Sequence, residues 1–428
     1  MSGKNVDNMV SSDRRLVEQW LPLLETNFNA EVETAFRTAR KSYREKFKEI
    51  FKAEPTVFVA GTPQVTNLHP WPARRPCSIA RVLTLASVLP SNVGKNDFMS
   101  LVGFESLPQI AKDHILPILI NANPKRDQIK DLLKKLRKRN IGNIVIVDPM
   151  AGGGSIPLES LRLGFRTVAL EYNPVAYIIL KSTLEYPAKY DKTLYEDLKK
   201  EVRALMAYSK NELGKYYSKN CFNYTFARGF TCPECGGLIP IIHSTKLGTD
   251  GPYLKFDLNR KMKIFEVKIV DHETEFEKLR CPYCSRPFTA DEALKEWTAK
   301  HKQMLKFAID GDVEKVKEST KELLKIHIPL FKQIRGGFIP CDEEDGQLLL
   351  NAFTDLALQM RALKSYIPNQ LIPKENEVFE PLKNYGIEYW YQLFNPRQLL
   401  ALAKLIKYVN DLAIDLIEKK KEYGAGIV

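Results

Sequence analysis

Residues 143–174 read NIVIVDPMAGGGSIPLESLRLGFRTVALEYNP, and this stretch decides the fold that we predict. The run Ile144–Val147 is short, continuous and apolar, which is typical of a parallel strand buried on both faces. Asp148 follows at the carboxyl end of this strand, where open α/β sheets bind their ligands. The glycines at 152–154 allow the backbone to turn tightly and to approach a bound molecule closely.

A helix and a second strand follow these glycines. The leucines between Leu158 and Leu163 predict the helix, and Gly164 is placed to end it. Residues 167–170 predict the second strand, which ends at Glu171. A doubly wound fold places the carboxylate that binds a ribose about 20 residues beyond its glycine loop. The stretch therefore predicts a strand, a loop, a helix and a strand, with a ligand at the two strand ends.

The chemistry of the loop favours a cationic ligand over a nucleotide phosphate. The dinucleotide-binding pattern GxGxxG is absent, and the loop has no lysine that could bind a triphosphate. The carboxylate of Asp148 would repel a pyrophosphate but suits a positively charged ligand. S-adenosylmethionine carries a sulfonium and an ammonium group, so we predict that it binds here. The alternative is an ordinary strand–turn–helix with glycines at a tight corner.

The same stretch resembles a known family. Residues 148–155, DPMAGGGS, resemble the DPFxGxG cofactor loop of amino-methyltransferases that modify exocyclic amines in DNA. Residues 171–174, EYNP, resemble the E/DxNP that follows it. More narrowly, residues 68–408 resemble the adenine-specific DNA methylases that contain a zinc ribbon. The resemblance implies these cofactor-binding residues: Asp148, Pro149, Met150, Ala151, Gly152, Gly153, Gly154, Ser155, Glu171, Tyr172, Asn173 and Pro174. It implies that Asp148 lies near the amino-acid end of the cofactor and that Glu171 binds its ribose.

An upstream segment carries the same resemblance. Residues 68–90, LHPWPARRPCSIARVLTLASVLP, predict a rigid extended stretch that leads into a helix from about Ser78. They resemble the HPxxKP element beside the cofactor pocket of amino-methyltransferases, and the HxWxARRP-like stretch of the zinc-ribbon methylases. The resemblance implies that His69, Trp71 and Arg74 bind the cofactor. The alternative is a proline-rich linker that enters a helix.

Two CxxC pairs predict a metal site. Cys232 and Cys235 form the first pair, and Cys281 and Cys284 form the second. Alternating apolar and polar residues between the pairs predict antiparallel strands. Four thiolates give zinc a closed tetrahedral shell that suits a structural site. We therefore predict a zinc ribbon, with two redox dithiols as the alternative; the resemblance implies that the ribbon helps to recognise DNA.

The composition indicates a globular protein with a polyanionic partner. The chain has 428 residues, of which 44% are hydrophobic and 27% charged. Its 64 lysines and arginines exceed its 52 acidic residues, so the formal net charge is +12. We find neither a signal peptide nor an apolar run of membrane-spanning length, and expect a soluble cytoplasmic protein.

The predicted fold class is α/β: a Rossmann-like S-adenosylmethionine-dependent methyltransferase core with an inserted β-rich zinc ribbon and additional helices. We divide the chain into an N-terminal helical region (1–60), the core (61–220), the ribbon (221–290), a helical hairpin and linker (291–345) and a C-terminal helical region (346–428). The hairpin is predicted to be helical as far as residue 333, with a break at Gly311. The C-terminal region is the expected partner interface, and its PRQL segment, also found in the zinc-ribbon methylases, predicts a helix that Asn395 caps.

Two basic helices are expected outside these motifs, at residues 30–52 and 125–139. Their basic faces are either solvated or in contact with DNA phosphates.

One motif of the resembled family is missing. Amino-methyltransferases hold the target amine with [D/N/S]PP[Y/F/W], and this chain contains no PP pair. We therefore expect a split enzyme, in which this chain binds the cofactor, carries no catalytic residue of its own and forms a hetero-oligomer with a second polypeptide that supplies the motif. The expected reaction is methyl transfer to an exocyclic amine of DNA, with adenine N6 implied by the resemblance alone. The alternatives are an RNA methyltransferase subunit and a non-catalytic zinc-ribbon subunit that binds nucleic acid.

Overall fold

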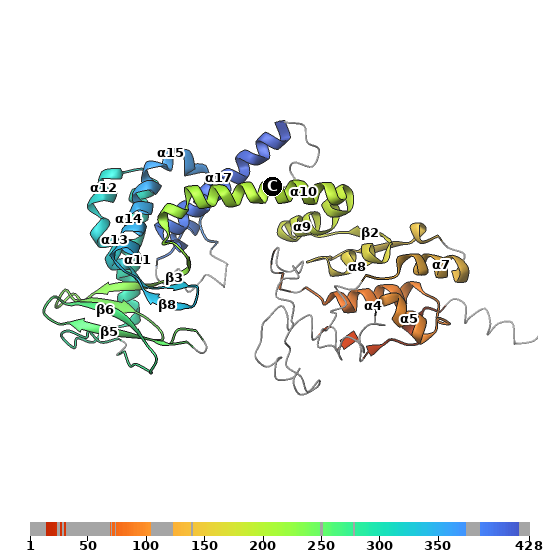
Figure 1. Ribbon diagram of the computed structural model, residues 1–428, viewed down its shortest axis with the longest axis horizontal. Helices are drawn as coiled ribbons and strands as arrows, with labels where there is room; N and C mark the ends of the chain where they lie inside the picture. Colours follow the sequence, from red (N-terminus) through yellow and green to blue (C-terminus); the bar gives the residue numbers. More distant parts are fainter. Residues whose placement is uncertain are drawn as a thin grey trace, which may run out of the picture. The chain divides into compact units, whose positions relative to one another are not determined.

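The computed structural model describes residues 14–23, 26–27, 30, 69, 71–72, 74–103, 123–137, 140–248, 251–276, 279–373 and 386–418. The described part of the chain is mixed α/β, with 54% helix and 17% strand. The chain divides into two compact units, Met1–Asp197 and Leu198–Val428 (Figure 1). Each unit has its own apolar core. Within the described ranges, none of the helices is long and apolar enough to cross a lipid bilayer.

The first unit is built around one β–α–β element. β1 (Val145–Asp148) pairs in parallel with β2 (Arg166–Ala169), and α8 (Ser155–Leu163) connects them. Gly164 ends α8 in the left-handed region, with φ 95°, and its N–H donates to carbonyl groups of the last helical turn. The order of elements predicted from the sequence is therefore confirmed, as is the glycine that ends the helix.

The other helices of this unit include α4 (Cys77–Val88), α5 (Lys95–Val102) and α7 (Arg126–Arg137). They pack with α8 into an apolar core in which Leu85, Phe98 and Ile129 are fully buried. α7 confirms the second predicted basic helix, and its described lysines are exposed. The first basic helix, predicted at residues 30–52, lies almost entirely outside the described residues.

The prediction that β1 is buried on both faces is wrong. Ile144 and Ile146 contact the apolar core, whereas Val145 is 43% and Val147 is 56% exposed. Val168, on the same face of β2, is 45% exposed. The reason is that the described helices bury only one face of the β1–β2 sheet. We call the other side, formed by Val145, Val147, Val168 and Leu170, the open face.

A buried ion pair joins α4 to α8. Nε of Arg81 lies 2.5 Å from Oε2 of Glu159, and the two side chains are 1% and 0% exposed. The other oxygen of Glu159 accepts a hydrogen bond from Arg162 at 2.8 Å. Arg81 also donates to the carbonyl of Val102 at 3.1 Å. The pair thus fixes α8, and with it the loop before α8, to the rest of the unit.

The second unit contains a four-stranded antiparallel sheet in the order β4–β3–β7–β8. Its strands are β3 (Cys221–Thr231), β4 (Leu238–Ile241), β7 (His327–Ile334) and β8 (Gly337–Pro340). A separate hairpin consists of β5 (Tyr253–Asn259) and β6 (Ile264–Val270). The residues predicted as a ribbon, 221–290, therefore share their main sheet with later residues of the chain.

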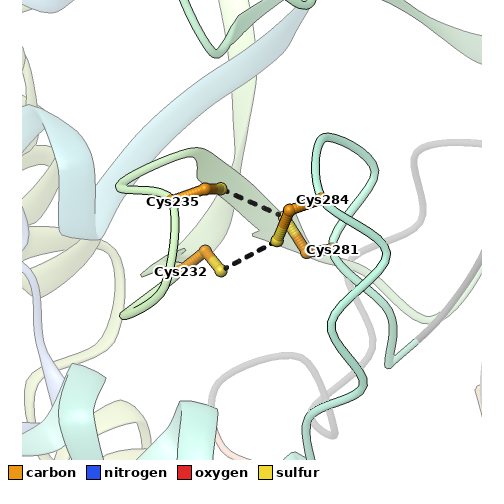
Figure 2. A group of neighbouring side chains, drawn as sticks. All are labelled: Cys232, Cys235, Cys281 and Cys284. Carbon is orange, nitrogen blue, oxygen red and sulfur yellow. Dashed lines mark hydrogen bonds between the residues drawn. The ribbon is translucent and has the colours of Figure 1, made fainter.

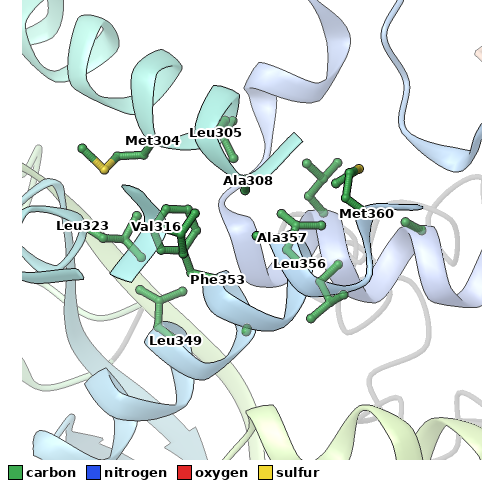
Figure 3. Packing of buried hydrophobic residues seen from close by; sticks show 14 of the residues in the cluster. Met304, Leu305, Ala308, Val316, Leu323, Leu349, Phe353, Leu356, Ala357 and Met360 are labelled. Atoms are coloured by element: carbon green, nitrogen blue, oxygen red, sulfur yellow. The ribbon is translucent and has the colours of Figure 1, made fainter. Parts of the chain in front are cut away.

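Helices build the apolar core of the second unit. They are α11 (Ala290–Ile309), α12 (Val313–Glu318), α13 (Thr320–Ile326), α14 (Glu343–Leu358), α15 (Met360–Leu363) and α17 (Pro396–Glu418). Figure 3 shows this core, in which Leu305, Leu349 and Phe353 are fully buried. The N–H of Gln398 donates to Oδ1 of Asn395 at 2.9 Å, which confirms the predicted cap of α17.

The predicted helix at residues 327–333 is wrong, because these residues form β7. β7 pairs with β3, and Phe331 lies opposite Thr225. Pro329 has no N–H to donate in a helix interior, and Ile328 and Phe331 favour a strand. Gly311 separates α11 from α12 as predicted, with φ 73°.

We predict that Glu159→Ala destabilises the first unit by about 3–5 kcal/mol, because Arg81 remains buried without its ionic partner. Hydrogen-exchange mass spectrometry on peptides from α4 and α8 measures this loss. The paired replacement Arg81→Met with Glu159→Leu should recover most of it. Equal losses in the single and the paired variants would contradict this account.

Candidate cofactor loop and metal centre

The loop after β1 is held by the carboxylate that follows β2. The N–H of Gly152 donates to Oε2 of Glu171 at 2.6 Å. Oε1 of Glu171 accepts the N–H groups of Tyr172 and Asn173 at 2.9 and 3.0 Å. These donors, first Asn173 and then Gly152, stabilise the charged carboxylate and lower the pKa of Glu171. The two strand ends that the sequence predicts as a site thus lie within hydrogen-bonding distance.

Asp148 lies at the start of this loop. It is 9% exposed, and its Oδ1 accepts the N–H of Met150 at 3.2 Å. The backbone of the loop also forms hydrogen bonds with the residue that follows β2. The N–H of Leu170 donates to the carbonyl of Asp148 at 2.9 Å, and the N–H of Ala151 donates to the carbonyl of Leu170 at 3.0 Å. The loop is therefore a fixed turn, with one carboxylate at each strand end.

The outer rim of the loop is open to solvent. Pro149, Asn173 and Pro174 are exposed. Met150 is 85% exposed and Tyr172 is 102% exposed, so an apolar and an aromatic side chain both project from the strand ends. A ligand at the strand ends would meet these two side chains first.

Trp71 and Arg74 lie against the glycines. A Cβ atom on Gly152 would lie 2.8 Å from Nε1 of Trp71, and one on Gly153 would lie 2.7 Å from Nε of Arg74. A Cβ atom on Gly154 would lie 2.7 Å from Leu180. From the sequence, we assigned these glycines to the close approach of a ligand. In the structure, side chains of the protein occupy the space that each missing Cβ leaves.

Trp71 and Arg74 of the upstream segment therefore lie beside the glycine loop, as the resemblance implies. Oγ of Ser155 donates to the carbonyl of Arg75 at 2.6 Å, which adds a direct bond between the two segments. Arg74 is 5% exposed, so it is part of the packed wall of the loop. His69, the third predicted residue of the segment, is exposed.

The EYNP residues also have a structural role. Oδ1 of Asn173 accepts the N–H of Val175 at 2.9 Å and caps α9 (Pro174–Leu180). Pro174 is the first residue of α9, a position where its missing N–H costs nothing. This short motif therefore ends β2, binds the glycine loop and starts a helix within four residues.

Sequence reasoning missed Arg81 and Glu159. Neither belongs to a motif, and their contact joins helices far apart in the chain. The available signal was that each is a charged residue in a largely apolar predicted helix. The two residues act on the loop through packing, because α8 begins where the loop ends.

The four predicted cysteines lie together in the second unit (Figure 2). Their sulfur atoms all lie within 4.8 Å of one another. Sγ of Cys232 is 3.7 Å from Sγ of Cys284, and Sγ of Cys235 is 3.6 Å from Sγ of Cys281. A tetrahedral site with metal–sulfur bonds of about 2.3 Å has sulfur–sulfur edges of roughly 3.8 Å. The cluster therefore has the geometry to hold one tetrahedral metal ion.

Both CxxC pairs form the same backbone turn. The N–H of Gly236 donates to the carbonyl of Cys232 at 2.8 Å, and the N–H of Ser285 donates to that of Cys281 at 2.9 Å. Gly236 and Ser285 both occupy the left-handed region, with φ 72° and 62°. Two equivalent turns that face each other are the arrangement expected of a four-cysteine knuckle site.

The backbone favours the thiolate form of Cys232, whereas the pKa values of the other three cysteines of the cluster are raised. Burial alone would raise the pKa of Cys232, but the N–H groups of Cys235 and Glu234 donate to its sulfur and lower the pKa to about 7. The thiolate is the form that binds metal. Of the other cysteines, Cys77 is buried, whereas Cys221 and Cys341 are partly exposed.

Comparisons with known proteins add no assignment. A scan against protein-family models and searches of curated proteins and of solved structures found no match for this chain. The family resemblance therefore depends on the motifs and on the geometry given above.

We predict that Gly153→Ala destabilises the loop by about 1–3 kcal/mol, because the added methyl group must displace the buried guanidinium of Arg74. Gly142→Ala is the control, since the nearest atom to its Cβ would lie 3.7 Å away. Hydrogen exchange of the loop peptide measures both effects. If the two variants behave alike, Arg74 does not pack against the loop in solution.

Proposed function

We propose that this chain is the S-adenosylmethionine-binding part of a split DNA amino-methyltransferase with a Rossmann-like core. The observation that carries the proposal is the bond between Glu171 and Gly152. It joins an acidic residue after β2 to a glycine loop after β1. Doubly wound folds bind the ribose of a nucleotide-like cofactor at these carboxyl ends of the strands.

The residues around the loop fit the chemistry of this cofactor. Asp148 and Glu171 supply negative charge for a ligand that carries a sulfonium and an ammonium group. A carboxylate offers about four acceptor sites. Three N–H groups occupy sites on Glu171, so acceptor capacity remains for a ribose hydroxyl. Met150 and Tyr172 offer exposed apolar surface to the adenine ring.

Trp71 and Arg74 have a positioning role in this proposal. They pack against Gly152 and Gly153, so they set the shape of the loop. When bound, S-adenosylmethionine supplies an activated methyl group. The residues of this chain bind and orient the cofactor, and no general base on the chain is needed once the amine is positioned.

The open face supports the need for a partner. Its four members are between 43% and 56% exposed, although parallel sheets are normally covered on both faces. Among the described residues, this sheet consists of β1 and β2 alone. The sequence lacks the [D/N/S]PP[Y/F/W] motif. We propose that the polypeptide carrying that motif adds its strands beside β1, covers the open face and presents the target amine near Asp148.

The cysteine cluster completes the proposal. Four thiolates leave a bound metal no open position, so a Zn²⁺ ion here would be structural. The ion would join the turn after β3 to the turn before α11, and would stabilise the part of the second unit that we expect to contact DNA.

Methyl incorporation tests the function. The chain is co-expressed with the product of the neighbouring reading frame, and tritiated S-adenosylmethionine is supplied with duplex DNA or structured RNA. We expect incorporation into DNA that Asp148→Asn reduces at least tenfold and that Asp127→Asn, an exposed acid in the same unit, does not change. Incorporation into RNA alone would favour an RNA methyltransferase. Full activity of Asp148→Asn would favour a non-catalytic role for this chain.

We predict that Cys281→Ser abolishes the binding of one zinc ion per chain and lowers the melting temperature of the second unit, because a structural site needs its closed shell. Elemental analysis and calorimetry measure the two effects. Cys341→Ser is the control, since Cys341 lies outside the cluster. A wild-type chain purified without zinc, and insensitive to chelators, would refute the metal site.

A further inference from the structure

A small pocket lies in the second unit where β3 begins and α17 begins. Its volume is about 210 Å³. Its aromatic lining consists of Tyr217, Phe222, Tyr224 and Phe226, and Asn395, Arg397 and Gln398 form one polar wall. The PRQL segment, which shares the family resemblance but has no role in the proposed cofactor site, thus supplies one wall of a pocket.

The inner wall of the pocket is rigid. The guanidinium of Arg397 lies 4.2 Å from the centre of the Tyr224 ring and 4.7 Å from that of Tyr217. Arg397 is 3% exposed and donates to the carbonyl of Tyr216 at 3.1 Å. The hydroxyl of Tyr224 lies 2.8 Å from Oδ1 of Asp345, which is fully buried. The cation and the rings are therefore held in place before any ligand binds.

The mouth of the pocket, unlike its inner wall, is open to solvent. Phe222 is 71% exposed, so its ring offers a free flat surface beside the pocket. The neighbouring rings are buried or half-buried, which makes Phe222 the one aromatic side chain of this lining that is open to solvent. An exposed aromatic ring is unfavourable in water and suits a partner that stacks on it.

The polar wall presents hydrogen-bond donors in fixed positions. The N–H of Asn395 donates to Oε1 of Gln398 at 3.0 Å, and the N–H of Gln398 donates to Oδ1 of Asn395 at 2.9 Å. This reciprocal cap uses both carboxamide oxygens, which leaves the two NH₂ groups as hydrogen-bond donors. The wall therefore offers amide donors and a cation, and it suits a ligand with acceptor groups.

We propose that this pocket binds one unpaired base of a nucleic acid strand. Every base has a flat face that can stack on Phe222, and its ring nitrogens and carbonyl oxygens can accept bonds from the two NH₂ groups. Arg397 excludes a cationic ligand and favours a strand that carries phosphates. The pocket is large enough for a single base, so duplex DNA without an extruded base does not fill it.

The inference rests on the nucleic-acid partner of the proposed function but not on its cofactor. It can therefore be tested without S-adenosylmethionine. The probe is a short fluorescent single-stranded DNA, with the matching duplex and a single-stranded RNA of the same sequence for comparison. Binding to the full chain, purified with its metal, is measured by fluorescence anisotropy.

We expect the chain to bind the single strand more tightly than the duplex. Phe222→Ala should weaken binding of the single strand about tenfold, since stacking of one base contributes roughly 1–3 kcal/mol. The loss should be the same at low and high salt, because stacking does not depend on charge. Met262→Ala, at a side chain that is 66% exposed between β5 and β6, is the matched control and should bind like the wild type.

Phe222→Trp provides the second measurement. It keeps the stacking surface, so it should bind like the wild type, and its added emission should be quenched when a base stacks on it. No binding of the single strand by the wild type, unchanged binding by Phe222→Ala, or unchanged emission of Phe222→Trp in the complex would each overturn the inference. Normal binding of the strand with no methyl transfer would instead count against the proposed function alone.

Discussion

The hydrogen bond from the amide of Gly152 to the carboxylate of Glu171 is the constraint on which the first unit depends. It holds the end of β2 to the loop after β1, although the two strands are only four residues long. The loop also needs glycines because Trp71 and Arg74 occupy the space in which Cβ atoms of residues 152 and 153 would lie. A loop packed so tightly on its inner side can meet a ligand only at its outer rim.

The second unit depends on a different interaction. Asp345 is fully buried at the start of α14 and accepts hydrogen bonds from the side chains of Ser218, Tyr224 and Lys332. These bonds connect β3, β7 and α14, and keep the pKa of Asp345 low, at about 2, although its burial acts in the opposite direction. The same network fixes the ring of Tyr224, on which Arg397 stacks. The base-binding pocket that we propose is therefore preorganised by a buried carboxylate.

Local features of both units could be predicted from the sequence, since they depend on residues close together in the chain. The β–α–β order, the end of α8 at Gly164 and the cap of α17 at Asn395 are examples. The cysteine cluster could be predicted because two CxxC turns have few other uses. Three features could not be predicted. The apolar pattern of β1 does not say what covers each face. Residues 327–333 become a strand only because β3 is there to pair with them. The contact of Arg81 with Glu159 joins residues 78 positions apart that belong to no motif.

Calorimetric titration of S-adenosylmethionine tests the central claim most directly, namely that the loop between β1 and α8 binds this cofactor. It is titrated into the chain alone, and then into the chain co-expressed with its neighbour. The account predicts binding at one site per chain in the co-expressed complex, and loss of that binding in Asp148→Asn. The absence of binding in both preparations would contradict the account.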